Sequence, residues 1–204
     1  MKKLIVATRN KGKLKEIKEI MRDFPFEVIS MEAVGLNDDI EENGSTFEEN
    51  AMIKAREVSG LTGEMVMADD SGLEVDYLNG APGIYSARFA GPGASDKDKN
   101  MKLLGLLEGV PFEKRRARFV CAIAVVFPDG RSFVVRGVCE GIIGYEEKGE
   151  NGFGYDPLFF VPEFNMTSAE MEPDEKHKIS HRGKALRLMT EELKKYLSAD
   201  TKWC

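Results

Sequence analysis

The sequence predicts an α/β protein whose β-sheet is mixed, and three observations lead to this fold class. Short apolar runs typical of strands alternate with segments whose apolar residues recur at helical spacing. The chain has 204 residues, enough for one domain or two closely packed lobes with a sizeable core. Two β-rich runs, 117–127 and 131–138, flank Pro128-Asp129-Gly130, a turn typical of a β-hairpin. The sheet therefore contains an antiparallel element and is not purely parallel.

The N-terminal segment predicts a strand, a short polar loop and a helix, at 3–8, 9–12 and 13–23 respectively. Lys11 and Lys13 lie where the helix begins, although cations are disfavoured beside the positive end of the helix dipole. A phosphate bound there would remove this conflict, because backbone N–H groups and lysines would hold it together. Lysine side chains that reach into solvent are the alternative.

An acidic loop at 37–44 precedes a helix whose start, Ser45 to Glu49, has the pattern of a capping box. Glu41 and Glu42 lie outside that helix, so one of the pair could hold a divalent ion together with Asp70. Oxygen ligands suit Mg²⁺ or Mn²⁺, and a Mg²⁺ site usually takes one or two carboxylates plus substrate phosphates. A solvated acidic loop is the alternative, and spacing alone does not exclude it.

Two carboxylates, Asp69 and Asp70, follow an apolar run, 65–68, that predicts a short buried strand. We expect the strand to stop there and Ser71-Gly72 to form a loop that approaches a ligand. A buried ionised Asp normally faces a cleft, a cap or a cation, because burial without a partner is costly. Adjacent strand residues point to opposite faces, so one Asp would face the site while the other supports the turn. The alternative is that one of them merely caps the turn.

The rest of the chain adds further elements. We expect a strand at 27–30, a turn at 79–83, a helix at 96–108 with Ser95 as its N-cap, a strand at 158–161 and a helix at 182–197.

A glycine-rich stretch at 149–157 places two aromatic residues, Phe153 and Tyr155, beside glycines. Such a loop can come close to a flat ligand, and either ring could stack on a nucleobase. Asp156 could accept hydrogen bonds from the base. The alternative is a turn that leads into the following core strand.

Cations gather a second time just before and at the start of the last helix. They are Lys176, Lys178, His181, Arg182 and Lys184. Because the same conflict with the helix dipole occurs twice in one chain, solvation explains it poorly. Both helix starts therefore suggest an anionic ligand.

Composition excludes several classes of protein. The formal net charge of −6 argues against broad nucleic-acid binding, and the basic cluster at 115–118 is most simply a solvated strand edge. No apolar run approaches ~18 residues, and the one at 4–7 is too short for a signal peptide, so we expect a cytoplasmic protein without a membrane span. Neither a disulfide framework nor a zinc site is indicated by the three widely spaced cysteines, Cys121, Cys139 and Cys204.

Five motifs occur along the chain: TRNKGK at 8–13, EENGSTFEENA at 41–51, ADDSGLEVDYLNGAPGIYSARFAG at 68–91, GFGYDPLF at 152–159 and SHRGKAL at 180–186. Together they resemble the inosine triphosphate pyrophosphatase family, also called HAM1-like or non-canonical purine NTP pyrophosphatases, and most closely its bacterial dITP/XTP pyrophosphatases. The resemblance covers nearly the whole chain. It implies a single domain, 1–204, with an elongated mixed β-sheet flanked by helices and two lobes around a central cleft, as in ITPase/Maf-like folds.

The resemblance also implies a hydrolase that cleaves ITP, dITP and XTP to the monophosphate and pyrophosphate with Mg²⁺ or Mn²⁺, as a homodimer that cleanses the nucleotide pool. Carried over by motif, Asp70 is the catalytic residue, and Glu42, Asp70 and Asp69 are the metal ligands. The residues implied in substrate binding are Thr8, Arg9, Asn10, Lys11, Gly12, Lys13, Ser71, Phe153, Gly154, Tyr155, Asp156, Lys176, His181 and Arg182.

A mechanism follows for these residues. Metal and Lys13 would neutralise the triphosphate, while Asp70 would orient or deprotonate a water that attacks the α-phosphorus. A donor such as Arg182 or Lys176 would favour the 6-oxo group of hypoxanthine or xanthine over the 6-amino group of adenine, which leaves a buried donor unpaired.

Two other functions remain open at this point. The first is a Maf-like nucleotide pyrophosphatase with a different base preference, against which GFGYD and SHRGKAL argue. The second is a non-catalytic nucleotide sensor, which would keep the basic helix ends but would not need Asp70 and Glu42.

Overall fold

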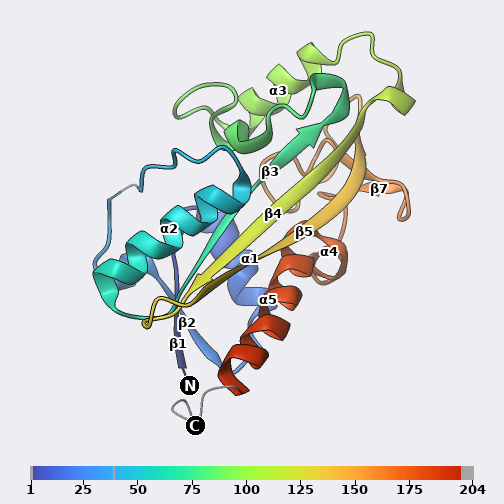
Figure 1. Ribbon diagram of the computed structural model, residues 1–204. Coiled ribbons are helices and arrows are strands. Elements are labelled where there is room, and N and C mark those ends of the chain that lie inside the picture. The colour runs from blue at the N-terminus through green and yellow to red at the C-terminus, as the bar shows by residue number, and fades with distance from the viewer. Residues whose placement is uncertain (1, 39, 199–204) are drawn as a thin grey trace. The chain divides into compact units, whose positions relative to one another are not determined.

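The computed structural model describes residues 2–38 and 40–198, and these residues contain a seven-stranded mixed sheet. Figure 1 shows its long central strands β3, β4 and β5 side by side. The strand order is β2-β1-β3-β4-β5-β6-β7. The strands are β1 Lys2–Val6, β2 Phe26–Ser30, β3 Val66–Val75, β4 Arg116–Val126, β5 Ser132–Ile143, β6 Phe159–Val161 and β7 Met166–Thr167. β1 pairs in parallel with β2 and β3, whereas β6 pairs antiparallel with β5 and β7. The predicted mixed sheet is therefore confirmed.

Five α-helices are found among the described residues. They are α1 Lys11–Ile20, α2 Phe47–Thr62, α3 Asp96–Leu106, α4 Pro173–Ile179 and α5 His181–Ser198. Short 3-10 helices cover Met31–Val34, Asp76–Leu78, Gly83–Arg88 and Phe112–Lys114. None of the described helices has both the length and the apolar composition that a membrane span needs. Asp39 of the acidic loop and Cys204 lie outside the described residues.

The chain divides into two compact units. Unit 1 lies within residues 1–70, 121–137 and 181–204, and unit 2 within 71–120 and 138–180. Strands β3, β4 and β5 contribute residues to both. Whether the units form a single domain with two lobes around a cleft stays a prediction.

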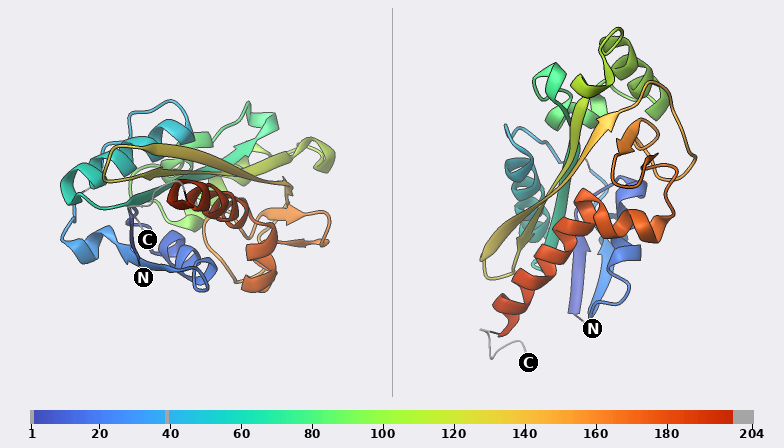
Figure 2. Two further views of the ribbon diagram at one scale, coloured as in Figure 1. Left: turned by 60° about the horizontal axis from the view of Figure 1, so that its bottom comes forward. Right: turned by 90° about the vertical axis from the view of Figure 1, so that its right-hand side faces the viewer.

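In unit 1, α2 covers one face of the sheet, and α1 and α5 cover the other (Figure 2). The core beneath α1 and α5 joins Ile17 and Met21 of α1 with Leu186 and Met189 of α5. Sheet side chains complete it: Leu4, Val6, Met65, Met67, Cys121, Ile123 and Val125. In the unit 1 part of β3, Met67 therefore points toward α1 and α5, and alternation along the strand sends Asp69 to the same face.

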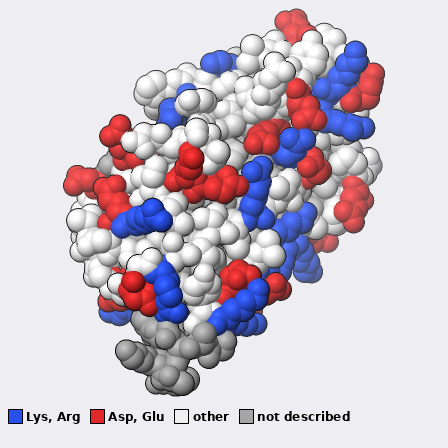
Figure 3. Space-filling view, in the orientation of Figure 1, with Lys and Arg blue, Asp and Glu red and all other residues white. Residues whose placement is uncertain are grey.

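Unit 2 has its own apolar core. Leu103 and Leu107 pack there with Tyr155, beside the sheet residues Leu73, Val75, Phe119 and Phe159. Side chains of both charges are interspersed on the face drawn in Figure 3, which shows no large basic area.

The prediction that the third strand ends at Asp69 and Asp70 is wrong, because β3 continues to Val75 and includes Ser71-Gly72. The strand continues because its two carboxylates find cations on the helices that pack against the sheet. The alternation of buried side chains then resumes at Leu73 and Val75.

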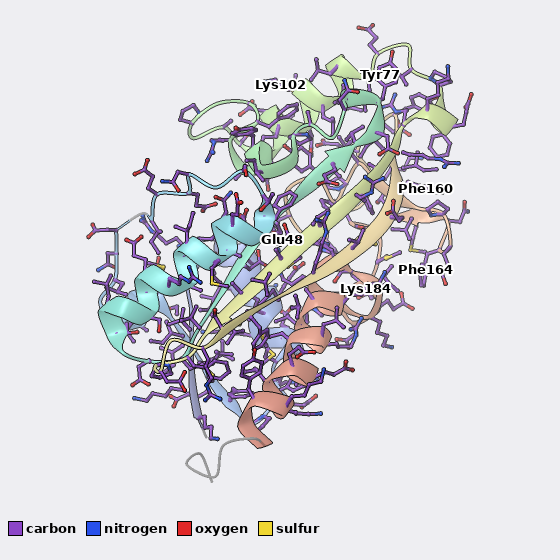
Figure 4. The ribbon with its side chains drawn as sticks, in the orientation of Figure 1. Glu48, Tyr77, Lys102, Phe160, Phe164 and Lys184 are labelled. Atoms are coloured by element: carbon purple, nitrogen blue, oxygen red, sulfur yellow. The ribbon has the colours of Figure 1, made fainter. Side chains whose placement is uncertain are left out.

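The helix starts follow the capping pattern with one correction. α1 begins at Lys11 rather than Lys13, since Asn10 is its N-cap and its side chain accepts from the Lys13 N–H at 3.0 Å. Thr46 caps α2 as its pattern predicts, and Glu48 lies in the first turn (Figure 4). The short polar helix α4, which begins at Pro173, was not predicted.

Candidate active site

The site in unit 1 is built on the two carboxylates of β3. Met67 points toward α1 and α5, so alternation sends Asp69 to the same face and Asp70 to the face that α2 covers. The contacts agree, because Asp69 binds cations from α1 and α5 whereas Asp70 binds one from α2. The expectation that the two side chains point to opposite faces is thus confirmed, but neither supports a turn, because β3 continues through Ser71-Gly72.

Asp69 is 0% exposed, and both of its oxygens are engaged. Oδ1 lies 2.7 Å from Lys13 Nζ, while Oδ2 lies 2.8 Å from Arg182 Nε and accepts from the Cys121 thiol at 3.0 Å. Burial acts to raise the pKa of Asp69, but the charges of Arg182 and Lys13, with hydrogen bonds from Arg182 and Cys121, hold it well below its usual range. Asp69 is therefore an ionised centre that fixes two cations.

Asp70 is 6% exposed and has a different environment. Its Oδ1 lies 3.2 Å from the Lys54 ammonium, which is also 3.1 Å from Glu42 Oε1 and donates to the Asp69 carbonyl at 3.0 Å. Burial raises the pKa of Asp70 against the opposing charges of Lys54 and Lys13, and the nearby carboxylates add to the increase. Asp70 therefore holds a proton more readily than an ordinary Asp.

The residues around Asp70 fit a divalent cation. Its Oδ2 is buried without a hydrogen-bond partner among the described residues, and Oδ1 already converges with Glu42 on one positive charge, Lys54. Within 2–38 and 40–198, no group of three or more His, Cys, Asp and Glu side chains could hold a metal ion. Two carboxylates are nevertheless what Mg²⁺ commonly takes from a protein when substrate phosphates supply further oxygens.

The N-terminus of α1 lies beside this cluster through Lys13. The Asn10 N–H donates to Thr8 Oγ1 at 3.2 Å, which shapes the turn from β1 into the helix. No acidic residue occupies the first turn, which contains Lys11, Gly12 and Lys13. A helix start of this kind binds anions through its backbone N–H groups. Arg9 is exposed beside it.

Arg182 lies at the start of α5 and is 1% exposed. Besides Asp69, it forms a salt bridge with Glu16 of α1. Its neighbour His181 is buried as well. The guanidinium thus joins α1, β3 and α5 within unit 1, in addition to any contact with a ligand.

The predicted aromatic loop, residues 149–157, lies in unit 2 and is held from within. Asp156 Oδ2 accepts from the Phe153 N–H at 2.9 Å and lies 2.7 Å from Lys176 Nζ. The Lys176 ammonium is 5.6 Å from the centre of the Phe153 ring. A Cβ at Gly152 would lie 2.2 Å from Asp156 Oδ2, so this turn requires glycine.

The two aromatic residues of the loop differ in exposure. Tyr155 is buried in the unit 2 core, and its hydroxyl donates to the Ser86 carbonyl at 2.9 Å. Phe153 is half-buried. Of the two rings, Phe153 thus has more area available for stacking on a base.

The structure gathers the predicted residues into three groups. Lys13, Asp69 and Arg182 are in contact, as are Phe153, Asp156 and Lys176. Glu42 and Asp70 share Lys54. Ser71 follows Asp70 in β3. Gly154 lies in the aromatic loop between Phe153 and Tyr155.

Sequence reasoning missed three residues of unit 1: Glu16, Lys54 and Cys121. Lys54 had a signal, since it falls on the apolar side of α2 with Ala51 and Ala55, where a buried lysine needs a carboxylate partner. Glu16 and Cys121 had none, because their partners are distant in sequence.

Comparisons with known proteins place this chain in a family. The sequence model described as the Ham1 family matches residues 4–192. The chain is 54% identical to the dITP/XTP pyrophosphatase of Desulforamulus reducens, covering 91% of this chain and 92% of that protein. It is 51% identical to the dITP/XTP pyrophosphatase of Clostridium perfringens, covering 95% and 98%.

Solved structures show the same fold. A HAM1 protein from Coxiella burnetii superposes with a TM-score of 0.86 at 43% identity, covering 96% of this chain and all of that one. The Ham1 protein of Staphylococcus aureus gives a TM-score of 0.85 at the same identity, with coverage of 96% and 100%.

Proposed function

The chain belongs to the Ham1 family, and we propose that it hydrolyses dITP, XTP and ITP to the nucleoside monophosphate and pyrophosphate. Its relatives at 54% and 51% identity are dITP/XTP pyrophosphatases. The observation that carries the proposal is the cluster in which Asp70 and Glu42 converge on Lys54 while Lys13 is held by Asp69. Such a cluster suits a charged phosphate substrate.

We propose that Asp70 and Glu42 hold Mg²⁺, with Mn²⁺ as a substitute. When bound, the ion would neutralise phosphate charge and polarise the anhydride. Asp69 remains a predicted metal ligand, but its oxygens already meet Lys13, Arg182 and the Cys121 thiol, which favours a role in fixing those groups.

The protein's own residues would carry the remaining steps. Lys13 and the α1 N-terminus would bind the triphosphate. Lys54 lies close to the carboxylates of Asp70 and Glu42. The buried Asp70 carboxylate would accept a hydrogen bond or the proton from the attacking water. The water oxygen would bond to the α-phosphorus as the bond to the bridging oxygen breaks, and pyrophosphate would leave with that electron pair.

We propose that the base is read within unit 2 by the aromatic loop together with Lys176. His181 and Arg182 of unit 1 stay predicted substrate contacts. Phe153 would stack on the purine, and a cationic donor would pair with the 6-oxo group. Arg182 and Lys176 are each buried and ion-paired, so they are held in place before substrate binds. A donor fixed in this way discriminates strongly, because its N–H that faces the base finds no acceptor when the base carries a 6-amino group. We also propose a cytoplasmic homodimer.

Hydrolysis of ITP in ¹⁸O-labelled water tests the reaction. We expect pyrophosphate without label and inosine monophosphate carrying one ¹⁸O, as mass spectrometry would show. Label in orthophosphate, with inosine diphosphate as the other product, would mean attack at the γ-phosphorus and would overturn the proposal. Binding of ITP without any turnover would instead favour a nucleotide sensor.

A further inference from the structure

Helix α3 contacts the aromatic loop at one residue through two side chains. Asp96 Oδ2 accepts from the Gly154 N–H at 2.7 Å, and Asn100 Nδ2 donates to the Gly154 carbonyl at 3.1 Å. Asp96 and Asn100 are four residues apart, so they share one face of the helix. Both backbone polar groups of Gly154 are thus paired with α3, although helix and loop are far apart in sequence.

The two contacts differ in environment. Asn100 is 2% exposed, and its amide also donates to Glu147 Oε1 at 2.7 Å. Asp96 is partly exposed and forms an ion pair with Lys99 at 2.7 Å. Loss of the Asn100 amide leaves the Gly154 carbonyl and Glu147 without this donor. Replacing Asn100 is therefore expected to disturb the loop backbone at Gly154 more than replacing Asp96.

Helix α3 is itself fixed by its N-cap and by packing in the unit 2 core. A capping box between Ser95 and Asp98 fixes its first turn, and Leu103 is buried in the unit 2 core. On the next turn Lys102, seen on α3 in Figure 4, donates to the Phe89 carbonyl at 2.5 Å.

Gly154 directly follows Phe153 and has a positive φ of 64°. The Asp156 side chain accepts from the Phe153 N–H, and the Asp156 N–H donates to the Phe153 carbonyl at 3.3 Å. The backbone of Phe153 is therefore held by Asp156 from inside the loop, and that of Gly154 by α3 from outside. Without the outer contacts, the peptide after Phe153 loses its fixed orientation.

We propose that Asp96 and Asn100 are positioning residues that hold the Phe153 ring ready for the purine base, so that base affinity depends on the start of α3. This inference rests on the proposed function for the use of Phe153. It adds to that function two residues that touch neither phosphate nor metal ligands. Their effect falls on nucleoside recognition and leaves the hydrolytic step unchanged.

Four variants separate this role from general damage. Asn100→Asp keeps the shape of the side chain but replaces the donor by an acceptor that faces the Gly154 carbonyl. Asp96→Ala removes an acceptor, and Asp96→Asn restores it. Met101→Ala is the matched control, because this neighbour on α3 is 62% exposed.

Asn100→Asp loses the hydrogen bonds to both the Gly154 carbonyl and Glu147. We expect it to raise the KM for ITP about 10-fold or more, with kcat within about 2-fold of wild type. Asp96→Ala should give a smaller rise that Asp96→Asn reverses, and Met101→Ala should change nothing. Inhibition by inorganic triphosphate, which has no base, should keep the wild-type inhibition constant in every variant.

An inhibition constant for triphosphate that rises as much as the KM for ITP would mean a general structural defect and would overturn the inference. An unchanged KM in Asn100→Asp would also overturn it. Equilibrium binding of ITP in EDTA keeps the test independent of turnover. If wild type binds ITP without hydrolysing it, the proposed function fails, while weaker ITP binding by Asn100→Asp would still support the positioning role.

Discussion

Asp70→Asn is expected to slow pyrophosphate release from ITP by about 10²–10⁴-fold, the usual contribution of a positioned acid or base. The amide cannot accept a proton, and it weakens the pair of carboxylates that would hold Mg²⁺. The fold should persist, because the amide has the same shape and Lys54 keeps its contact with Glu42. Steady-state rates and thermal unfolding of the same preparation measure both effects.

Asp76→Asn is a suitable control for this substitution. Asp76 follows directly after β3, and its carboxylate pairs with Arg118 at 3.0 Å, whereas Asp70 pairs with Lys54. We expect wild-type rates from it. Turnover by Asp70→Asn within a few-fold of wild type would refute the catalytic assignment, whatever the control shows.

Asp69→Asn should have its largest effect on stability. Arg182 and Lys13 would each lose the Asp69 carboxylate, while Arg182 would keep its salt bridge with Glu16. Breaking a buried ion pair on one side typically costs about 3–5 kcal/mol. Urea unfolding at pH 7 measures this difference in unfolding free energy. A difference below about 1 kcal/mol would mean that the buried cluster contributes little.

The difference in unfolding free energy between wild type and Asp69→Asn should depend on pH. The pKa of Asp69 in the folded protein lies well below its usual value, so the carboxylate stabilises the fold above the unfolded pKa of about 3.9. This stabilisation is lost as the pH falls below that value toward the folded pKa. The gap between wild type and Asp69→Asn should therefore be full at neutral pH and narrow in acid. A gap independent of pH would show that Asp69 does not act through its charge.

Local patterns predicted much of the fold because their signals lie within a few residues. Helical periodicity located α1, α2, α3 and α5, and capping residues such as Ser95 and Thr46 marked their starts. The length of the third strand was underestimated, because it was expected to end at Asp69 and Asp70 but continues to Val75. A strand that contains two carboxylates looks interrupted when their partners are unknown.

Those partners explain why the site was only partly predictable. Arg182 and Asp69 are 113 positions apart, and only the packing of α5 on the sheet brings them together. Alternation along β3 did predict that Asp69 and Asp70 would point to opposite faces. It could not predict that Lys54 would approach one and Lys13 the other, since that depends on which helix covers each face. The contacts of Gly154 with α3 were hidden for the same reason.

The most direct measurement is the rate of pyrophosphate release from ITP, dITP, XTP, ATP and GTP, each with Mg²⁺ and with EDTA. We predict fast release from ITP, dITP and XTP that EDTA abolishes, and much slower release from ATP and GTP. Equal turnover of ATP would keep the phosphate chemistry but contradict recognition of the 6-oxo group. Full activity in EDTA would contradict the metal role of Asp70 and Glu42.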